Sequence, residues 1–254
     1  MKKVLLVGGC SFTANNFETL VHPEMDTSWQ MWPQLLAKKL DMQLVNVAIS
    51  GAGNEQIFSS ILDTLQYHID PKRVGLVLAA WSQSQRGSWQ ESKYGYWKNN
   101  RVFADGDIFG WVKRAMRYWH MFQLLCESHN LPYKQFQMLP IFESWLNGLF
   151  KNDWEIAKNK KDPKPDFVER YKYPGDVDRD KKMLEQMVFN YEKHINTKNW
   201  ILWPPLNRNG CIEHKVLRDE NFKYKDGYVI SRYDTHPTKL GQEKIAEFIH
   251  ERLG

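Results

Sequence analysis

The stretch VGLVLAA, at residues 74–80, predicts a β-strand that is buried on both faces. A short, continuous apolar run is typical of a strand inside a parallel sheet. Two further runs precede it, KVLLV at residues 3–7 and QLVNVA at residues 43–48, and glycines follow each of them. These three runs predict three strands of one sheet.

Segments with the helical spacing of apolar residues separate the three runs. Residues 27–40 and 54–68 each place apolar side chains on one face of a helix. This alternation implies right-handed crossovers and a parallel sheet. We therefore predict an α/β fold with three layers, in which a flavodoxin-like parallel sheet of about five strands has helices on both faces. In such sheets the ligand crevice lies beyond the carboxyl ends of the strands.

The rest of the chain is less regular. Residues 84–101 combine four aromatic residues with small and polar ones and predict a long aromatic loop. Apolar patterns predict helices at 108–130, 180–195 and 239–253, and strands at 133–139 and 200–203. Residues 150–174 are charged and show no periodicity. We expect a single domain over residues 1–254, with a large aromatic and charged insertion at about residues 87–200.

The composition narrows the classes of partner. Apolar residues make up 42% of the chain and the formal net charge is +5, with basic and acidic residues interleaved. This pattern favours a globular protein with a solvated surface and no nucleic-acid partner. No apolar run approaches the roughly 20 residues that span a bilayer, so we expect no membrane partner.

The start of the chain and the metal-binding residue types are also informative. The apolar run after Met1 covers only residues 4–7, too short for a signal peptide, and this favours a cytoplasmic protein of cellular or viral origin. The three cysteines and eight histidines show no paired metal spacing, so we predict no metal and no cofactor. The oligomeric state is left open.

Two segments with chemical potential follow the first two predicted strands. In GGCSFT, residues 8–13, Ser11 lies on a turn that exposes its hydroxyl and its backbone N–H at the sheet edge. In NVAISGAGN, residues 46–54, glycines before a helix leave backbone N–H groups to face a negative charge. Considered alone, each segment also fits an ordinary tight turn.

Two more segments lie at the end of the third strand and before the last helix. In WSQSQR, residues 81–86, polar side chains could donate to an oxyanion, and Arg86 could hold an anionic group. A polar surface loop is the simpler alternative for this segment. In YDTHP, residues 233–237, Asp234 and His236 point the same way in an extended chain, as an acid and a base must. A helix start capped by Thr238 explains the same residues structurally.

Taken in this order, the four segments resemble the sequence blocks of the SGNH hydrolases, also called GDSL esterases and lipases. The resemblance covers roughly residues 3–86 and 230–254. It implies Ser11 as nucleophile, His236 as base, Asp234 as acid and Gly51 as an oxyanion-hole donor together with the N–H of Ser11. It also implies a side-chain donor, with Ser82, Gln83 and Asn54 as candidates. We expect Trp81 and Arg86 to contact the substrate.

Three departures from the family pattern stand out. Cys10 replaces the aspartate that gives the GDSL motif its name. The third block lacks the usual Gly-x-Asn, and Ser82 or Gln83 stands where the asparagine would be. The acid lies two residues before the histidine, whereas three is the commoner spacing, and an Asp-Thr-His arrangement resembles that of some SGNH-like polysaccharide O-acetyltransferases.

The function that follows is hydrolysis of an acyl ester by a Ser-His-Asp mechanism. We expect an acetyl or other short acyl group, carried by a small molecule or a glycan. An SGNH-type O-acyltransferase is the nearest alternative, because only the acyl acceptor differs. A catalytically weak carbohydrate-binding domain is the second, because the third block is altered.

Overall fold

The computed structural model describes residues 2–91, 95–100, 107–141, 177–207 and 209–253. Within them, five parallel strands form the central sheet in the order β2-β1-β3-β6-β7. The strands are β1 (Val4–Gly8), β2 (Gln43–Asn46), β3 (Val74–Trp81), β6 (Tyr133–Gln137) and β7 (Trp200–Ile201). The parallel sheet of about five strands is therefore confirmed.

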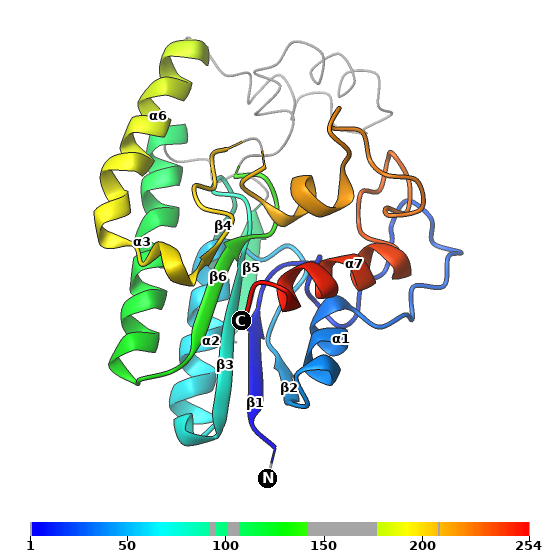
Figure 1. Cartoon of the computed structure of the whole chain (residues 1–254), viewed down its shortest axis with the longest axis horizontal. Helices are drawn as coiled ribbons and strands as arrows, with labels where there is room; N and C mark the ends of the chain where they lie inside the picture. Colours follow the sequence, from blue (N-terminus) through cyan, green and yellow to red (C-terminus); the bar gives the residue numbers. More distant parts are fainter. Residues whose placement is uncertain (1, 92–94, 101–106, 142–176, 208, 254) are drawn as a thin grey trace.

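Helices cover both faces of the sheet, which completes the three predicted layers (Figure 1). Helices α1 (Trp32–Lys39) and α7 (Lys239–His250) pack together on one face. Helices α2 (Asn54–Tyr67) and α3 (Ile108–Ser128) cover the other face, and α6 (Val177–Tyr191) packs against α3. Shorter helical turns span Pro71–Arg73, Glu192–His194 and Thr197–Asn199, and a π-helical turn spans Glu213–Leu217.

The core divides at the sheet into two apolar clusters. All five residues of β1 are buried, and its side chains alternate between the clusters: Leu6 packs with α2 and α3, and Leu5 with α1 and α7. A strand covered on both faces needs apolar residues at every position, which explains the continuous runs in the sequence. Buried tryptophans contribute to this packing, namely Trp32, Trp81, Trp111, Trp119 and Trp200.

The strand order places a topological switch point at β1. The chain passes from β1 through α1 to β2 on one side, and then returns through α2 to β3 on the other side. The two connections lie on opposite faces, so they diverge beyond the carboxyl end of β1 and leave a crevice there. Ser11 follows β1, and the turn that contains Gly51 follows β2. The fold thus brings the first two candidate segments to the same edge.

Three expectations about individual elements need correction. The predicted aromatic loop contains an antiparallel hairpin, β4 (Gly87–Glu91) and β5 (Tyr96–Asn100), in which Ser88 pairs with Asn99. Helix α1 begins five residues later than predicted, because Pro33 has no N–H and fits only in a first turn. Helix α6 begins before residue 180 and ends at Tyr191. The charged stretch 150–174 lies outside the described residues.

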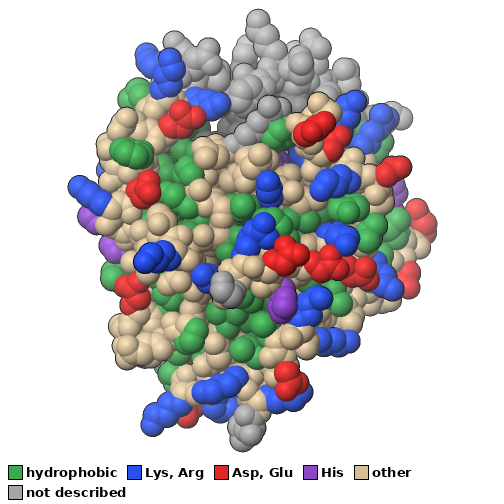
Figure 2. Space-filling model, viewed as in Figure 1, with side chains coloured by type: hydrophobic (Ala, Val, Ile, Leu, Met, Phe, Trp, Pro, Cys, Tyr) green, Lys and Arg blue, Asp and Glu red, His purple; other side chains and the backbone are tan. Residues whose placement is uncertain are grey.

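The surface and the helices bear on possible partners. Lysine and arginine side chains are interspersed with aspartate and glutamate on the face shown in Figure 2. Among the described residues, no helix combines the length and the apolar character that crossing a membrane requires. That no nucleic acid binds stays a prediction.

Candidate active site

Ser11 lies on a tight turn directly after β1. The backbone N–H groups of Thr13 and Ala14 both donate to the carbonyl of Cys10, at 2.8 and 3.0 Å. A Cβ at Gly9 would lie 2.5 Å from Oγ1 of Thr13, so this turn needs glycine at that position. The N–H of Ser11 donates to no described residue. The turn therefore leaves both the hydroxyl and the amide of Ser11 available for chemistry.

His236 connects Ser11 to Asp234. Its Nε2 lies 2.8 Å from Oγ of Ser11, and its Nδ1 lies 2.6 Å from Oδ1 of Asp234. An ionised carboxylate can only accept, so Nδ1 carries the proton and donates to Asp234. The remaining nitrogen of a neutral imidazole is then an acceptor for the hydroxyl proton of Ser11. This is the tautomer that a general base needs.

Asp234 is held as a carboxylate. Burial opposes its charge, but hydrogen bonds from His236 and Thr19 outweigh that cost and lower its pKa to about 2. The Thr19 hydroxyl donates to Oδ2, and the backbone N–H of His236 donates to Oδ1 at 3.1 Å. Thr19 lies outside the four sequence blocks, six residues after the first one, and no local pattern marks a threonine that contacts a residue 215 positions away.

Two aromatic rings fix the plane of the imidazole. Phe17 stacks on His236 with ring centroids 4.0 Å apart and an interplanar angle of 27°, and Phe12 packs at 4.7 Å. Both phenylalanines are buried. Contact with two buried rings restricts the freedom of the imidazole to turn away from Ser11. Apart from the position of Phe12 beside the serine, no pattern in the sequence predicts these contacts.

The turn after β2 lies next to the turn after β1. The N–H of Ile49 donates to the carbonyl of Gly9 at 3.1 Å, and Nδ2 of Asn46 donates to the carbonyl of Thr13 at 2.7 Å. Gly51 has φ of +80°, a conformation that favours glycine. Its N–H donates to no described residue. The N–H groups of Ser11 and Gly51, neither of which has a partner among the described residues, thus come from adjoining turns.

The candidates for a side-chain donor surround the end of β3. Oδ1 of Asn54 accepts from the N–H of Ser82 at 2.9 Å, which turns the amide nitrogen of Asn54 the other way. The Ser82 side chain is fully buried, and Oε1 of Gln83 accepts from Nε of Arg86 at 2.8 Å. Asn54 is therefore anchored to the strand that neighbours β1, while Gln83 is engaged with Arg86.

The expectation that Trp81 contacts substrate is wrong. Its side chain is completely buried, packs edge-on against Phe122 at 5.7 Å, and donates through Nε1 to Gln135 at 3.0 Å. Strand β3 extends one residue further than the sequence predicted, so Trp81 belongs to the core rather than to the loop. Arg86 is partly buried beside Gln83, and its role toward substrate stays a prediction.

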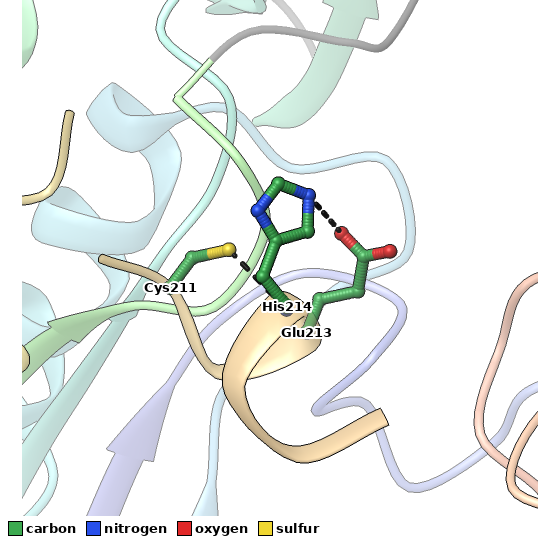
Figure 3. A group of neighbouring side chains, drawn as sticks. All are labelled: Cys211, Glu213 and His214. Carbon is green, nitrogen blue, oxygen red and sulfur yellow. Dashed lines mark hydrogen bonds and ion pairs between the residues drawn. The ribbon is translucent and has the colours of Figure 1, made fainter. Parts of the chain in front are cut away.

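A second group of reactive side chains lies after β7, in and before the π-helical turn (Figure 3). The ligand atoms of Cys211, Glu213 and His214 lie within 4.8 Å of one another. However, Glu213 accepts from Arg218 at 2.7 Å and also from the Tyr224 hydroxyl, and burial raises the pKa of the Cys211 thiol. The charge of Glu213 is thus already compensated by Arg218, and nothing in this described cluster requires a metal ion.

Comparison with known proteins supports the fold. No protein-family profile matches the sequence, and no curated protein does. Among solved structures, a protein described as lipolytic and of the G-D-S-L family, from Desulfitobacterium hafniense, is similar with a TM-score of 0.50 and 15% identity. The match covers 98% of this chain and 99% of that one. The protein TesA is similar with a TM-score of 0.47 and 13% identity, over 99% of this chain and 98% of its own. The likeness to the G-D-S-L protein shows that the chain has the SGNH-hydrolase fold, as its sequence blocks predicted.

Proposed function

We propose that the chain hydrolyses a carboxylic ester, with Ser11 as nucleophile, His236 as general base and Asp234 as the acid that orients the base. The observation that carries this proposal is the continuous hydrogen-bonded line from Ser11 through His236 to Asp234, at 2.8 and 2.6 Å. These separations lie within the reach that proton transfer requires. The SGNH-like fold and its lipolytic relative point to the same chemistry.

The reaction begins when Nε2 of His236 takes the proton of Ser11 as Oγ attacks the acyl carbonyl. Asp234, with its lowered pKa, stays ionised and stabilises the imidazolium that forms. The imidazolium then gives its proton to the departing alcohol, which leaves an acyl group on Ser11. Water, activated by the same histidine, releases the acid.

The oxyanion would be held by the N–H groups of Ser11 and Gly51, which come from adjoining turns and donate to no described residue. We place Asn54 as the side-chain donor ahead of Ser82 and Gln83. Its Oδ1 is fixed by Ser82, so its amide nitrogen is the end left for a ligand. Loss of one such donor costs about 10²–10³ in rate. Asn54, from the second block, would avoid this loss by taking the place of the asparagine that is absent from the third block.

The acyl group we propose is acetyl or another short chain. Ser11 is only 7% exposed, and the candidate donor Asn54 is 5% exposed, so little room is open around the nucleophile. For the alcohol part we propose a polar molecule such as a sugar, because the partly buried Arg86 places a polar side chain at the same sheet edge.

The test is hydrolysis of p-nitrophenyl acetate and butyrate by the wild type, Ser11→Ala and His236→Ala, with circular dichroism as the check on folding. We expect both variants to lose about 10³-fold or more in kcat, since the residues act as one unit. Release of acetate from an acetylated xylo-oligosaccharide would support a sugar as the alcohol part. Full activity in folded Ser11→Ala would refute the proposal.

A further inference from the structure

The hairpin formed by β4 and β5 contacts the turn that carries Gly51. The N–H of Gly53 donates to Oγ of Ser88 at 2.9 Å, and Oγ of Ser88 donates to Oδ1 of Asn99 at 2.6 Å. Ser88 and Asn99 are cross-strand partners in the hairpin. A relay of two hydrogen bonds therefore joins the turn to both strands of the hairpin.

The fit between turn and hairpin is close as well as hydrogen-bonded. A Cβ on Gly53 would lie 2.8 Å from Oγ of Ser88 and 3.1 Å from the carbonyl oxygen of Arg86. A Cβ on Gly51 would meet Cβ of Asn99 at 3.9 Å. Glycine at position 53 thus lets the hairpin approach the turn, and Asn99 lies near Gly51, where an added side-chain carbon would only just touch it.

The hairpin is itself anchored to the body of the domain. Arg114, on α3, donates to the carbonyl of Arg86 at 2.8 Å and to that of Ser84 at 3.2 Å. Ser84 also donates its N–H to the carbonyl of Ile141 at 2.7 Å. Hydrogen bonds therefore fix both carbonyl and amide groups of the segment that leads from β3 into the hairpin. This segment holds Ser88 in place beside the turn.

From this arrangement we infer that Ser88 and Asn99 are positioning residues for ester hydrolysis, which act by holding the Gly51–Gly53 turn so that the N–H of Gly51 faces the oxyanion. The inference rests on the function proposed above. An oxyanion donor must lie about 2.7–3.1 Å from the developing charge, so a turn free to move by an ångström would lose much of its effect. The backbone of a glycine-rich turn can adopt many conformations, and the contacts with Ser88 and Asn99 restrict them.

The test compares Ser88→Ala with Ser88→Thr and Gln90→Ala, using p-nitrophenyl acetate. Ser88→Ala removes both bonds of the relay, and we expect kcat to fall roughly 10–100-fold, less than the loss of a whole donor. KM should change little, because the oxyanion forms only after binding. Ser88→Thr keeps the hydroxyl and should recover most of kcat. Gln90→Ala removes a hydrogen bond within the same hairpin, from Nε2 to the carbonyl of Gly95, and should leave kcat unchanged.

Hydrogen–deuterium exchange of the peptide that contains Gly51 and Gly53 supplies a readout independent of catalysis. In Ser88→Ala we expect faster exchange there, and in Gln90→Ala no change. Unchanged kcat and unchanged exchange in folded Ser88→Ala would overturn the inference, and so would a loss of kcat that Gln90→Ala reproduces. Ser11→Ala separates the two proposals: if it stays active the proposed function fails, whereas an inactive Ser11→Ala beside a fully active Ser88→Ala refutes only the positioning role.

Discussion

Asp234 receives its hydrogen bonds from two separate parts of the chain. His236 approaches Oδ1, and Thr19, on the loop between β1 and α1, donates to Oδ2. The same Thr19 oxygen accepts from the N–H groups of Val21 and His22, at 3.3 and 3.2 Å. The loop that follows Ser11 is thereby tied to the segment that holds His236, so the orientation of His236 depends on residues outside the sequence blocks.

We predict that Thr19→Val raises the pKa of Asp234, because one of the hydrogen bonds that stabilise the carboxylate is lost. A lowered pKa contributes stability that is present above the unfolded value and is lost as pH falls through the folded value. In the wild type that loss spans roughly pH 4 to pH 2. The variant should therefore lose stability at a higher pH within this window, as followed by tryptophan fluorescence. Thr64→Val, which removes a hydrogen bond to the carbonyl of Ser60 instead, is the control and should not shift the acid transition.

The sequence alone identified those candidate site residues that are marked by the end of a strand or by their spacing in the chain. Ser11 follows a glycine turn after a buried strand, and Asp234 and His236 alternate in an extended segment before the last helix. Their meeting depends on sheet topology, which the strand and helix pattern predicts. Thr19 and Phe17 could not be predicted, because their contacts are made across the fold by a loop that has no periodic pattern.

The segment that contains His236 leads directly into the first turn of helix α7. Thr238 caps the helix by accepting from the N–H of Gly241 at 3.2 Å, and the N–H of Thr238 donates to the carbonyl of Tyr228 at 3.1 Å. The N–H of Ile230 donates to the carbonyl of His236 at 3.0 Å. Hydrogen bonds with the loop at residues 228–230 therefore hold the backbone at His236 and at Thr238.

Gly241→Ala should disturb this arrangement. An added Cβ would lie 2.2 Å from the carbonyl oxygen of Tyr228 and 2.9 Å from Cβ of Pro237, so backbone must move. We expect the free energy of unfolding to fall by about 1–3 kcal/mol and kcat to fall with it, as measured by thermal unfolding and ester hydrolysis. Gly110→Ala, on α3, meets its nearest atom at 3.5 Å and should be neutral or stabilising, since alanine favours a helix. Equal effects of the two substitutions would contradict the account.

The strands of the β4–β5 hairpin could not be predicted from the sequence. Residues 87–91 and 96–100 combine tryptophan and tyrosine with glycine, serine, lysine and asparagine, so no clean alternation of apolar and polar residues marks two strands. Its pairing is supported by contacts with the Gly53 turn rather than by a buried face of its own. Such an element is stabilised by its tertiary context, which propensity alone does not record.

At the scale of the molecule, a single sheet organises every candidate residue. Ser11, Gly51 and Ser82 follow three neighbouring strands, and α7 brings His236 over the same edge. The continuous apolar runs predicted this sheet, because strands covered on both faces must be apolar throughout. Strand β2 lies at the edge of the sheet and is only partly covered, which explains why its residues are partly exposed.

All three cysteines belong to the interior of this molecule. Cys10, Cys126 and Cys211 are free and buried, and burial raises the pKa of the thiols of Cys126 and Cys211. A thiol reacts with a disulfide reagent as the exposed thiolate, which is the attacking nucleophile. We predict that the native protein reacts very slowly with dithionitrobenzoate and that guanidinium chloride exposes all three thiols. Fast reaction of a thiol in the native protein would show that the packing described here is incorrect.

In the proposed reaction Ser11 is the nucleophile, and His236 activates it. The most direct measurement is the site of covalent labelling by a fluorophosphonate, mapped by mass spectrometry in the wild type, Ser11→Ala and His236→Ala. We expect one phosphonylated residue, Ser11, with no labelling in Ser11→Ala and much slower labelling in His236→Ala. A label on another residue of the wild type, or undiminished labelling of Ser11→Ala, would contradict this role of Ser11.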